Sequence, residues 1–444
     1  MLGLPVSIPK AKTSPGCSAG GARLFSLLRA LRHRNFQLFF WGQLLSLVGT
    51  WMQSVALSWL VYRLTGSSFL LGLVGFASQF PIFLAAPLGG MLADRRNRRY
   101  LVMGTQVASM ILALLLAVLT LRDVVQVWHV FVLSLLLGVV NAVDIPARQS
   151  FLIELVGRDD LMNAIALNST IFNGARTIGP AIAGVLVARL GEGWCFFVNG
   201  ISYIAVIAGL LMMRLPSSAP ALRSAPLAHL TEGVRFAWRT YPIRTLLILV
   251  GIVSLVAMPY TILMPLFADR ILHSGAKGLG VLMCATGLGA VLGALTLAAK
   301  TRVHGLGRWV ALSCCGFGAS LFLFAFSINF ALSVALLIPA GFCMMVQMAS
   351  CNTLIQAMVP DNLRGRIMAL YSMMFMGMAP IGALLGGAVA ARIGAPFTVA
   401  AGALVAVCSS VLFTAQLPKM RMRAGRLIVT QAKEYRDALE KMTA

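Results

Sequence analysis

The chain has 444 residues, of which 59% are hydrophobic and only 11% are charged, and its formal net charge at pH 7 is +23. Soluble proteins carry about 25% charged residues, so this composition excludes an ordinary soluble globular protein and indicates one that crosses a membrane many times. The basic excess alone would also suit a nucleic-acid-binding protein.

Apolar runs of about 20 residues, the length that a helix needs to cross a bilayer, recur along the chain. Twelve of them are predicted to be membrane spans, which makes the fold class an all-α membrane protein. Their ranges are 36–61, 70–92, 100–121, 127–149, 163–188, 194–213, 243–267, 276–299, 309–328, 330–354, 366–390 and 396–417.

Basic residues are concentrated in alternate connections between these spans. They are frequent before the first span and after the second, the sixth and the twelfth, and the opposite connections are poor in them. Basic loops stay in the cytoplasm, so the pattern predicts a multi-pass protein of a bacterial-type plasma (inner) membrane with both termini cytoplasmic. Because the loops account for the charge, the expected partner is the lipid bilayer and not nucleic acid.

A weak internal repeat relates the two halves of the chain. Leu161 corresponds to Leu363 and Asp159 to Asp361, each 202 positions later (363 − 161 and 361 − 159). Two six-span halves related in this way are typical of one large class of transporters. The predicted organisation is a cytoplasmic tail with an interfacial helix at 1–35, a six-helix bundle at 36–213, a cytoplasmic linker at 214–242, a second six-helix bundle at 243–417 and a cytoplasmic tail at 418–444.

The connection GGMLADRRNRRYLV (89–102) resembles the loop between spans two and three of the major facilitator superfamily, whose pattern is G-x-L-A-D-R-x-G-R-R/K-x-x-L. Asn97 replaces the usual glycine, a mild change because asparagine is the next residue to accept a positive φ in a tight turn. A loop that is merely positive-inside would explain the arginines but not the spacing of glycine, leucine and aspartate. The matching positions assigned to a gating loop are Gly90, Asp94, Arg95, Arg98 and Arg99.

The resemblance implies the major facilitator fold, two pseudo-symmetric six-helix bundles, and a role for this loop as a conformational latch. In that role Asp94 caps a neighbouring helix and pairs with a nearby arginine, because anions are stabilised at helix N-termini. The arginines of the loop would pair with acids of the adjacent bundle.

The stretch FNGARTIGPAIAG (172–184) resembles the fifth-span motif of proton-coupled exporters, G-x-x-x-G-P-x-x-G-G, at Gly179, Pro180 and Gly184. Two of its glycines are alanines here, which keeps a ridge of small residues that admits close helix approach. Plain helix packing without any export role would explain the same ridge.

The longer stretch 146–184 most resembles the enterobactin-exporter-like and macrolide-efflux-like branch, which consists of drug:proton antiporters. This resemblance implies export of a small amphiphilic molecule, drug-like or siderophore-like, by alternating access with proton influx and by a monomer. Alternatives are an uptake transporter of the same fold and a lipid-handling or non-transporting membrane protein. No hydrolase, phosphate-binding, haem or metal-ligand motif is found, so the sequence predicts neither an enzyme nor a cofactor.

Four polar residues within spans are candidates for the transport path or for proton coupling. Arg176 and Asn173 lie on a polar stripe of the fifth span, and an intramembrane charge is expected to face a cavity with a partner. Arg176 could instead be structural, tied to carbonyls or to an acid such as Asp144. Asp144 and Arg148 are four residues apart, which favours an ion pair near the inner end of span four over a protonation site.

Overall fold

The computed structural model describes residues 28–157, 159–214, 230–299 and 305–443, and within these ranges the chain is helical with short connections. Twelve helical stretches are long and apolar enough to cross a membrane, and each coincides with one of the twelve predicted spans. Large apolar side chains such as Leu312 and Leu323 point outward, as expected where lipid replaces water. The predicted all-α membrane fold is therefore confirmed.

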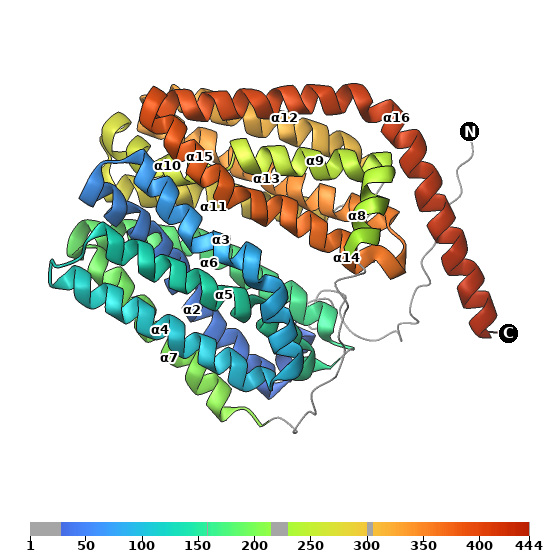
Figure 1. Ribbon diagram of the computed structural model, residues 1–444, viewed down its shortest axis with the longest axis horizontal. Coiled ribbons are helices and arrows are strands. Elements are labelled where there is room, and N and C mark those ends of the chain that lie inside the picture. Colours follow the sequence, from blue (N-terminus) through green and yellow to red (C-terminus); the bar gives the residue numbers. More distant parts are fainter. Residues whose placement is uncertain (1–27, 158, 215–229, 300–304, 444) are drawn as a thin grey trace, which may run out of the picture.

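The first six spans form one group of helices in Figure 1, which we call the first bundle. A short helix, η1 (Arg29–Arg32), precedes them. The six are α2 (Arg34–Thr65), α3 (Ser68–Arg95), α4 (Arg98–Leu121), α5 (Val127–Val156), α6 (Leu161–Leu190) and α7 (Glu192–Met212).

The other six spans form a second group, which we call the second bundle and which lies above the first in Figure 1. Most of the predicted linker, 215–229, lies outside the described residues, and its end forms α8 (Leu230–Arg239). The helices that follow are α9 (Tyr241–Val256), α10 (Tyr260–Leu266), η3 (Phe267–Ile271), α11 (Gly275–Ala298), α12 (Leu306–Ala325), α13 (Phe330–Met358), α14 (Asp361–Ser372), η4 (Met373–Gly377), α15 (Met378–Ile393) and α16 (Ala395–Thr443).

Spans seven and eleven are interrupted, which the sequence analysis did not predict. Span seven stops at Val256, restarts at Tyr260 after Pro259 and ends in the π-helical turn η3. Span eleven contains the π-helical turn η4 just before Pro380. Proline has no backbone N–H and cannot bond to the carbonyl four residues earlier, so these segments depart from regular α-helix.

The two groups of helices pack against each other through α6 with α11 and α3 with α15. Their backbones come into close contact near the connections that hold Gly66, Gly191 and His273, and we call this region the closed end. There the glycine pairs Gly72–Gly387 and Gly184–Gly280 leave no space for a Cβ atom on Gly72 or Gly280. Small residues thus allow the two groups to meet without intervening side chains.

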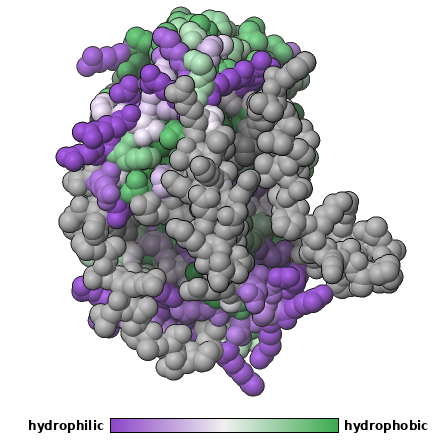
Figure 2. All heavy atoms as spheres, turned by 90° about the vertical axis from the view of Figure 1, so that its right-hand side faces the viewer, coloured by the Kyte–Doolittle hydropathy of each residue, from purple (hydrophilic) through white to green (hydrophobic). Residues whose placement is uncertain are grey.

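The opposite end of the molecule is polar. The ion pair Arg98–Glu154 joins α4 to α5 with an N···O distance of 2.7 Å, and Arg366 pairs with Glu232 of α8. Each of these two pairs joins helices of the same group. Figure 2 looks onto this end and shows many hydrophilic side chains around its margin.

The N-terminal segment is attached to the start of α6 at this opposite end. Arg29 forms an ion pair with Asp160, His33 Nε2 lies 2.8 Å from the same carboxylate, and the Ala30 N–H donates to Asn163 Oδ1 at 2.8 Å. The predicted interfacial helix begins within residues 1–27, which lie outside the described residues. What is described of it is the η1 turn held on α6.

Acid is expected to release this segment. The hydrogen bond with His33, together with that from Arg29, lowers the pKa of Asp160 below its ordinary value. A lowered carboxyl pKa stabilises the attachment above the unfolded value of about 3.9, and this contribution is lost as the pH falls through the folded value. A spin label at Leu28→Cys, in a background without native cysteines, should be immobile at pH 7 and become mobile as the pH falls below the ordinary carboxyl value of about 3.9. In the Asp160→Asn variant the label should be mobile at neutral and at acidic pH. Equal label mobility with and without Asp160→Asn at pH 7 would contradict the role of Asp160 in holding this segment.

Candidate functional site

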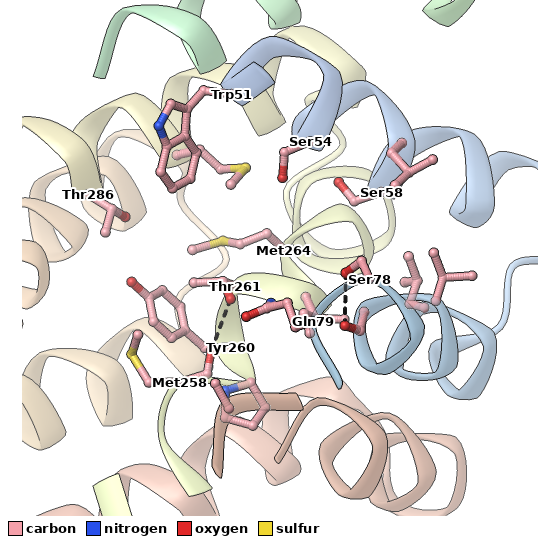
Figure 3. Close-up of a pocket in the computed structure, with 18 of the residues that line it drawn as sticks. Trp51, Ser54, Ser58, Ser78, Gln79, Met258, Tyr260, Thr261, Met264 and Thr286 are labelled. Atoms are coloured by element: carbon pink, nitrogen blue, oxygen red, sulfur yellow. Dashed lines mark hydrogen bonds between the residues drawn. The ribbon is translucent and has the colours of Figure 1, made fainter. Parts of the chain in front are cut away.

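A cavity of about 320 Å³ lies where the two groups of helices face each other. On one side it is lined by α2, α3 and α6, and on the other by α10, α11 and η4, together with the break in span seven (Figure 3). The interruption of span seven therefore places Met258, Pro259 and Tyr260 on the cavity wall. Cavities at such an interface, between repeats and beside a broken helix, are the usual place for a transporter's binding site.

The lining combines apolar side chains with a few polar groups. Leu57, Val61, Met264, Met283 and Phe375 contribute hydrocarbon or thioether surface. The polar lining residues are Trp51, Ser54, Ser58, Ser78, Gln79, Arg176, Tyr260, Thr261 and Thr286. All lining residues belong to the described part of the chain, and Arg176 is the one charged residue among them. Such a surface fits an amphiphilic ligand.

Arg176 has no carboxylate partner in the part of the chain that the structure describes. Its Nη2 atom lies 4.0 Å from Sδ of Met344, and its guanidinium carbon lies 5.7 Å from the centre of the Trp51 ring. A cation over an indole face is attracted by the ring quadrupole, but an aromatic ring does not neutralise the charge. Asn173, the other candidate on this helix, donates its amide to the Ser169 carbonyl at 2.9 Å and is not among the lining residues.

Tyr260 is a second unusual polar residue of the cavity. The residue is 1% exposed, and within the described residues its hydroxyl group makes no hydrogen bond of regular geometry, with the Thr286 side chain as its polar neighbour. Its ring packs edge-on against Phe317 with 6.0 Å between ring centres. Figure 3 shows the side chain extending toward Thr286, whose own hydroxyl donates to the Leu282 carbonyl at 3.2 Å. A buried unpaired hydroxyl costs about 1–3 kcal/mol, so this group is available to a ligand.

Asp144 and Arg148 form the predicted i,i+4 ion pair, with 2.9 Å between Oδ2 and Nη2. Thr105 and Gln106 of α4 donate to the other carboxylate oxygen of Asp144 at 2.7 and 2.9 Å. Arg148 also donates to Gln43 Oε1 of α2 at 2.8 Å. Asp144 therefore joins three helices of the first bundle, lies outside the cavity lining, and has Arg148 rather than Arg176 as its ion-pair partner.

The gating-loop residues occupy the connection between α3 and α4. Gly90 and Arg95 belong to the last turns of α3, and the side chain of Asp94 lies outside the described residues. Asn97 caps α4: its Oδ1 accepts from the Arg99 backbone N–H at 3.0 Å, with φ of −63°. The expectation that Asn97 replaces glycine by tolerating a positive φ is therefore wrong, because this position is an N-cap in which asparagine is favoured.

The arginines of this connection contact their own bundle. Arg98 pairs with Glu154 of α5, and Arg99 donates to the Leu211 carbonyl of α7 at 3.1 Å. These contacts position α4 against α5 and α7 at the polar end. The expected pairing of the arginines with acids of the other bundle stays a prediction.

The exporter-type motif on α6 lies at two close helix contacts. A Cβ atom on Gly179 would come within 2.6 Å of Trp51 Cβ and 2.9 Å of the Val48 carbonyl oxygen on α2. Gly184 faces Gly280 of α11, and Pro180 lines the cavity. The motif thus lets α6 pack closely against α2 of its own bundle and α11 of the other bundle. The close contact with α2 also brings Trp51 next to Arg176.

Polar contacts between the bundles occur at the closed end. The Tyr62 hydroxyl donates to Asp269 Oδ2 at 2.7 Å, and Arg270 donates to the Gly66 carbonyl at 3.0 Å. The Arg270 guanidinium also lies 5.8 Å from the Tyr62 ring centre. Tyr62 and Gly66 belong to the first bundle and Asp269 and Arg270 to η3 of the second, so these contacts stabilise closure.

Removing the Tyr62 hydroxyl is expected to open the closed end part of the time. Tyr62→Phe leaves Asp269 without this donor, and losing a hydrogen bond to a charged group costs about 1.5–3 kcal/mol. That loss would shift the open-to-closed ratio of this end about 10- to 150-fold. The distance between spin labels at Leu190→Cys and Ile328→Cys, both exposed positions, measures the opening. In Tyr62→Phe the distribution of this distance should gain a second, longer component. The control Tyr100→Phe removes a hydroxyl from the exposed face of α4 and should leave the distance distribution unchanged. Identical distributions in wild type, Tyr62→Phe and Tyr100→Phe would disprove the role of the Tyr62–Asp269 contact.

Several of these residues were not predicted from the sequence. Tyr260, Trp51 and Thr286 look like ordinary members of apolar spans, and only the proline before Tyr260 signals a helix break. Asp269 and Arg270 are adjacent charges just beyond a predicted span. That position is a signal for a helix-end contact, but it does not identify Tyr62 as the partner.

Comparison with known proteins gives consistent results. A family model described as transmembrane secretion effector matches residues 25–432. The chain is 26% identical to the staphyloferrin A transporter of Staphylococcus aureus, over 84% of this chain and 94% of that protein. It is 28% identical to the multidrug efflux pump Tap of Mycolicibacterium fortuitum, over 77% of this chain and 86% of the pump. It is also 28% identical to the enterobactin exporter EntS of Shigella boydii, over 82% of this chain and 86% of that exporter.

Solved structures share the fold. The nucleoside transporter NupG aligns with a TM-score of 0.67 at 14% identity, over 88% of this chain and 98% of that one. A bacterial homolog of the human lysosomal transporter Spinster, in an inward-facing and unoccupied conformation, aligns with a TM-score of 0.60 at 14% identity, over 90% and 98%. At this level of identity the match shows the arrangement of helices and not the substrate.

Proposed function

This chain belongs to the transmembrane secretion effector family of the major facilitator superfamily, a family of transporters, and we propose that it exports a small amphiphilic molecule by alternating access. The sequence prediction of this superfamily is confirmed. The direction of transport, the energy source and the cargo belong to the proposal. The names of three relatives, a transporter of staphyloferrin A, an exporter of enterobactin and a multidrug efflux pump, support an exported small molecule.

The observation that carries the proposal is the cavity between the two bundles. It is bordered by both halves of the chain, and toward the closed end the halves are held together by glycine contacts and by Tyr62–Asp269. Breaking these contacts and bringing the opposite ends together would expose the same cavity to the other side of the membrane. This is the geometry that alternating access requires.

The distribution of basic loops supports an orientation for this cycle. Arginines of the connection after α3 and of α8 lie at the polar end, so that end and both termini are proposed to be cytoplasmic. The closed end then faces outward, and the described conformation is the one in which an exporter loads from the cytoplasm. We further propose residence in the bacterial inner membrane and function as a monomer, since one chain supplies both walls of the cavity.

Proton influx is the proposed energy source, from the resemblance to proton-coupled exporters and from the lack of a nucleotide-binding motif in the sequence. The loop with Gly90, Asp94, Arg95, Arg98 and Arg99 is proposed to act as the latch of the polar end. Gly179, Pro180 and Gly184 are proposed to place α6 between the bundles. Arg176 is proposed as a residue of the transport path, with Asp144 and Arg148 as supports of the first bundle.

Inside-out vesicles test this function. Their lumen is acidified, a pH-sensitive dye is added, and a panel of amphiphilic compounds of different charge is supplied outside. Dye recovery on addition of a compound, absent from vesicles without the protein, would support proton-coupled export. Accumulation in right-side-out vesicles instead would replace export by uptake, and no compound-dependent flux in either orientation, with folded protein present, would contradict transport.

A further inference from the structure

We infer that the cargo is an anionic amphiphile whose acidic group is bound by Arg176 of the first bundle and by the Tyr260 hydroxyl of the second. The inference rests on the proposed function and assigns the charge of the molecule carried. Both residues line the same cavity, one on α6 and one at the start of α10. An acidic group between them would connect the two halves that must move relative to each other.

Arg176 supplies the first observation. It is the one charged group among the cavity-lining residues, and in the described part of the chain it has no acidic partner. A charge within a membrane span is expensive and is normally paired with an opposite charge or with backbone carbonyls. Here its neighbours are the Trp51 ring and the Met344 sulfur, neither of which carries a negative charge. The missing counterion is therefore supplied by the cargo.

Tyr260 supplies the second observation, which is independent of charge. Its hydroxyl group is buried and makes no hydrogen bond of regular geometry among the described residues, with Thr286 as its polar neighbour, although most buried polar groups in proteins are paired. A phenol hydroxyl donates well to a carboxylate or phenolate oxygen, and hydrogen bonds to charged acceptors are the strong ones. An anion would satisfy both the guanidinium and this hydroxyl, whereas an ammonium group could donate to the Tyr260 oxygen but would be repelled by the guanidinium.

The remainder of the wall fits the apolar part of such a molecule. Val61, Met264, Met283 and Phe375 offer apolar and thioether surface, and methionine adapts to ligands of different shape. A cationic amphiphile would enter the same space beside Arg176 with no carboxylate to pair with it. Like charges in a poorly solvated cavity repel strongly, so this site selects against cations.

A second cavity at the closed end repeats the charge pattern. It has a volume of about 400 Å³ and lies next to Gly66, with Arg270 as the one charged residue in its described lining. The Arg270 guanidinium is held by the Gly66 carbonyl and faces the Tyr62 ring. An anion leaving the first cavity through this end would meet a second arginine, next to the Asp269 carboxylate that accepts from Tyr62.

The test uses one molecular skeleton with three charges: 4-hexylbenzoate, its primary amide and 4-hexylbenzylamine. Binding to the full chain in lipid nanodiscs is measured by calorimetry and corrected with empty nanodiscs. In wild type the carboxylate should bind at least about tenfold more tightly than the amide, and the amine should not bind specifically. Arg176→Gln should weaken the carboxylate by about tenfold to a hundredfold and leave the amide unchanged.

Three further variants make the result specific. Arg176→Lys keeps the charge and should retain part of the preference for the carboxylate, and Tyr260→Phe should weaken the carboxylate several-fold more than the amide. Arg189→Gln removes an exposed positive charge from the same helix and should change nothing. Unchanged affinity of the amide in Arg176→Gln also shows that this variant is folded.

The inference is overturned if the carboxylate does not bind to wild type, if it binds no better than the amide, if the amine binds best, or if Arg176→Gln binds all three as wild type does. These outcomes are separate from those of the vesicle experiment. Flux of cationic compounds would leave export standing and refute the anionic cargo. The predicted order of affinities without flux of any compound would refute export and leave the anion site standing.

Discussion

Replacing Gly280 with valine is expected to abolish transport while leaving the chain folded in the membrane. At the closed end a Cβ atom on Gly280 would lie 2.6 Å from the Gly184 Cα atom and 2.6 Å from the Pro180 carbonyl oxygen. Both are backbone atoms of α6, so neither can move aside as a flexible side chain would. Helices α6 and α11 must therefore separate, at a cost of about 1–3 kcal/mol or more. We expect the rate of compound-dependent proton flux to fall at least about tenfold.

The matched control is Gly174→Val on α6, where a Cβ atom has no neighbour within 4 Å. It introduces the same β-branched side chain into a span without obstructing a helix contact, so its flux should stay near that of wild type. Spin labels at Leu190→Cys and Ile328→Cys should report a longer distance in Gly280→Val only. Normal flux and an unchanged distance in Gly280→Val would show that this contact is not needed for the transport cycle.

The twelve spans could be predicted because lipid imposes a simple demand, a helix of about 20 apolar residues, that every span meets. The interruptions of spans seven and eleven could not be predicted from proline alone. Pro146, Pro180 and Pro339 lie inside the continuous helices α5, α6 and α13. Whether a proline breaks a membrane helix depends on what neighbouring helices offer the freed carbonyl, and that information is absent from a single span.

The candidate site was predictable in part for a similar reason. Arg176 stands out because a charge in an apolar run is rare, and Asp144 and Arg148 stand out because their spacing matches the helical turn. Tyr260 carries no such mark, since its importance comes from a hydroxyl left unpaired by its surroundings. Asn173 also lies on the polar stripe, but its amide donates to the Ser169 carbonyl of its own helix, so its place on the transport path stays a prediction.

Replacing Asp144 with alanine is expected to lower the free energy of unfolding by about 3–5 kcal/mol, because removing one partner of a buried ion pair leaves the other uncompensated. Asp144 is 3% exposed, and the change would remove the carboxylate that accepts from Arg148, Thr105 and Gln106. Arg148 would keep its bond to Gln43, and Thr105 its bond to the Val102 carbonyl. Arg148 is 23% exposed on its side chain, so water relieves part of the penalty and the lower part of the range is expected. Unfolding in mixed detergent micelles, followed by circular dichroism, measures the change.

The double variant Asp144→Leu with Arg148→Met separates support from coupling. Since it removes both charges, it should be less destabilised than Asp144→Ala, and it should keep compound-dependent proton flux if the pair only joins α5 to α2 and α4. Binding of the carboxylate probe at Arg176 should also be preserved, because Asp144 lies outside that cavity. If the double variant is stable and binds the probe but no longer moves protons, the pair is part of the proton path.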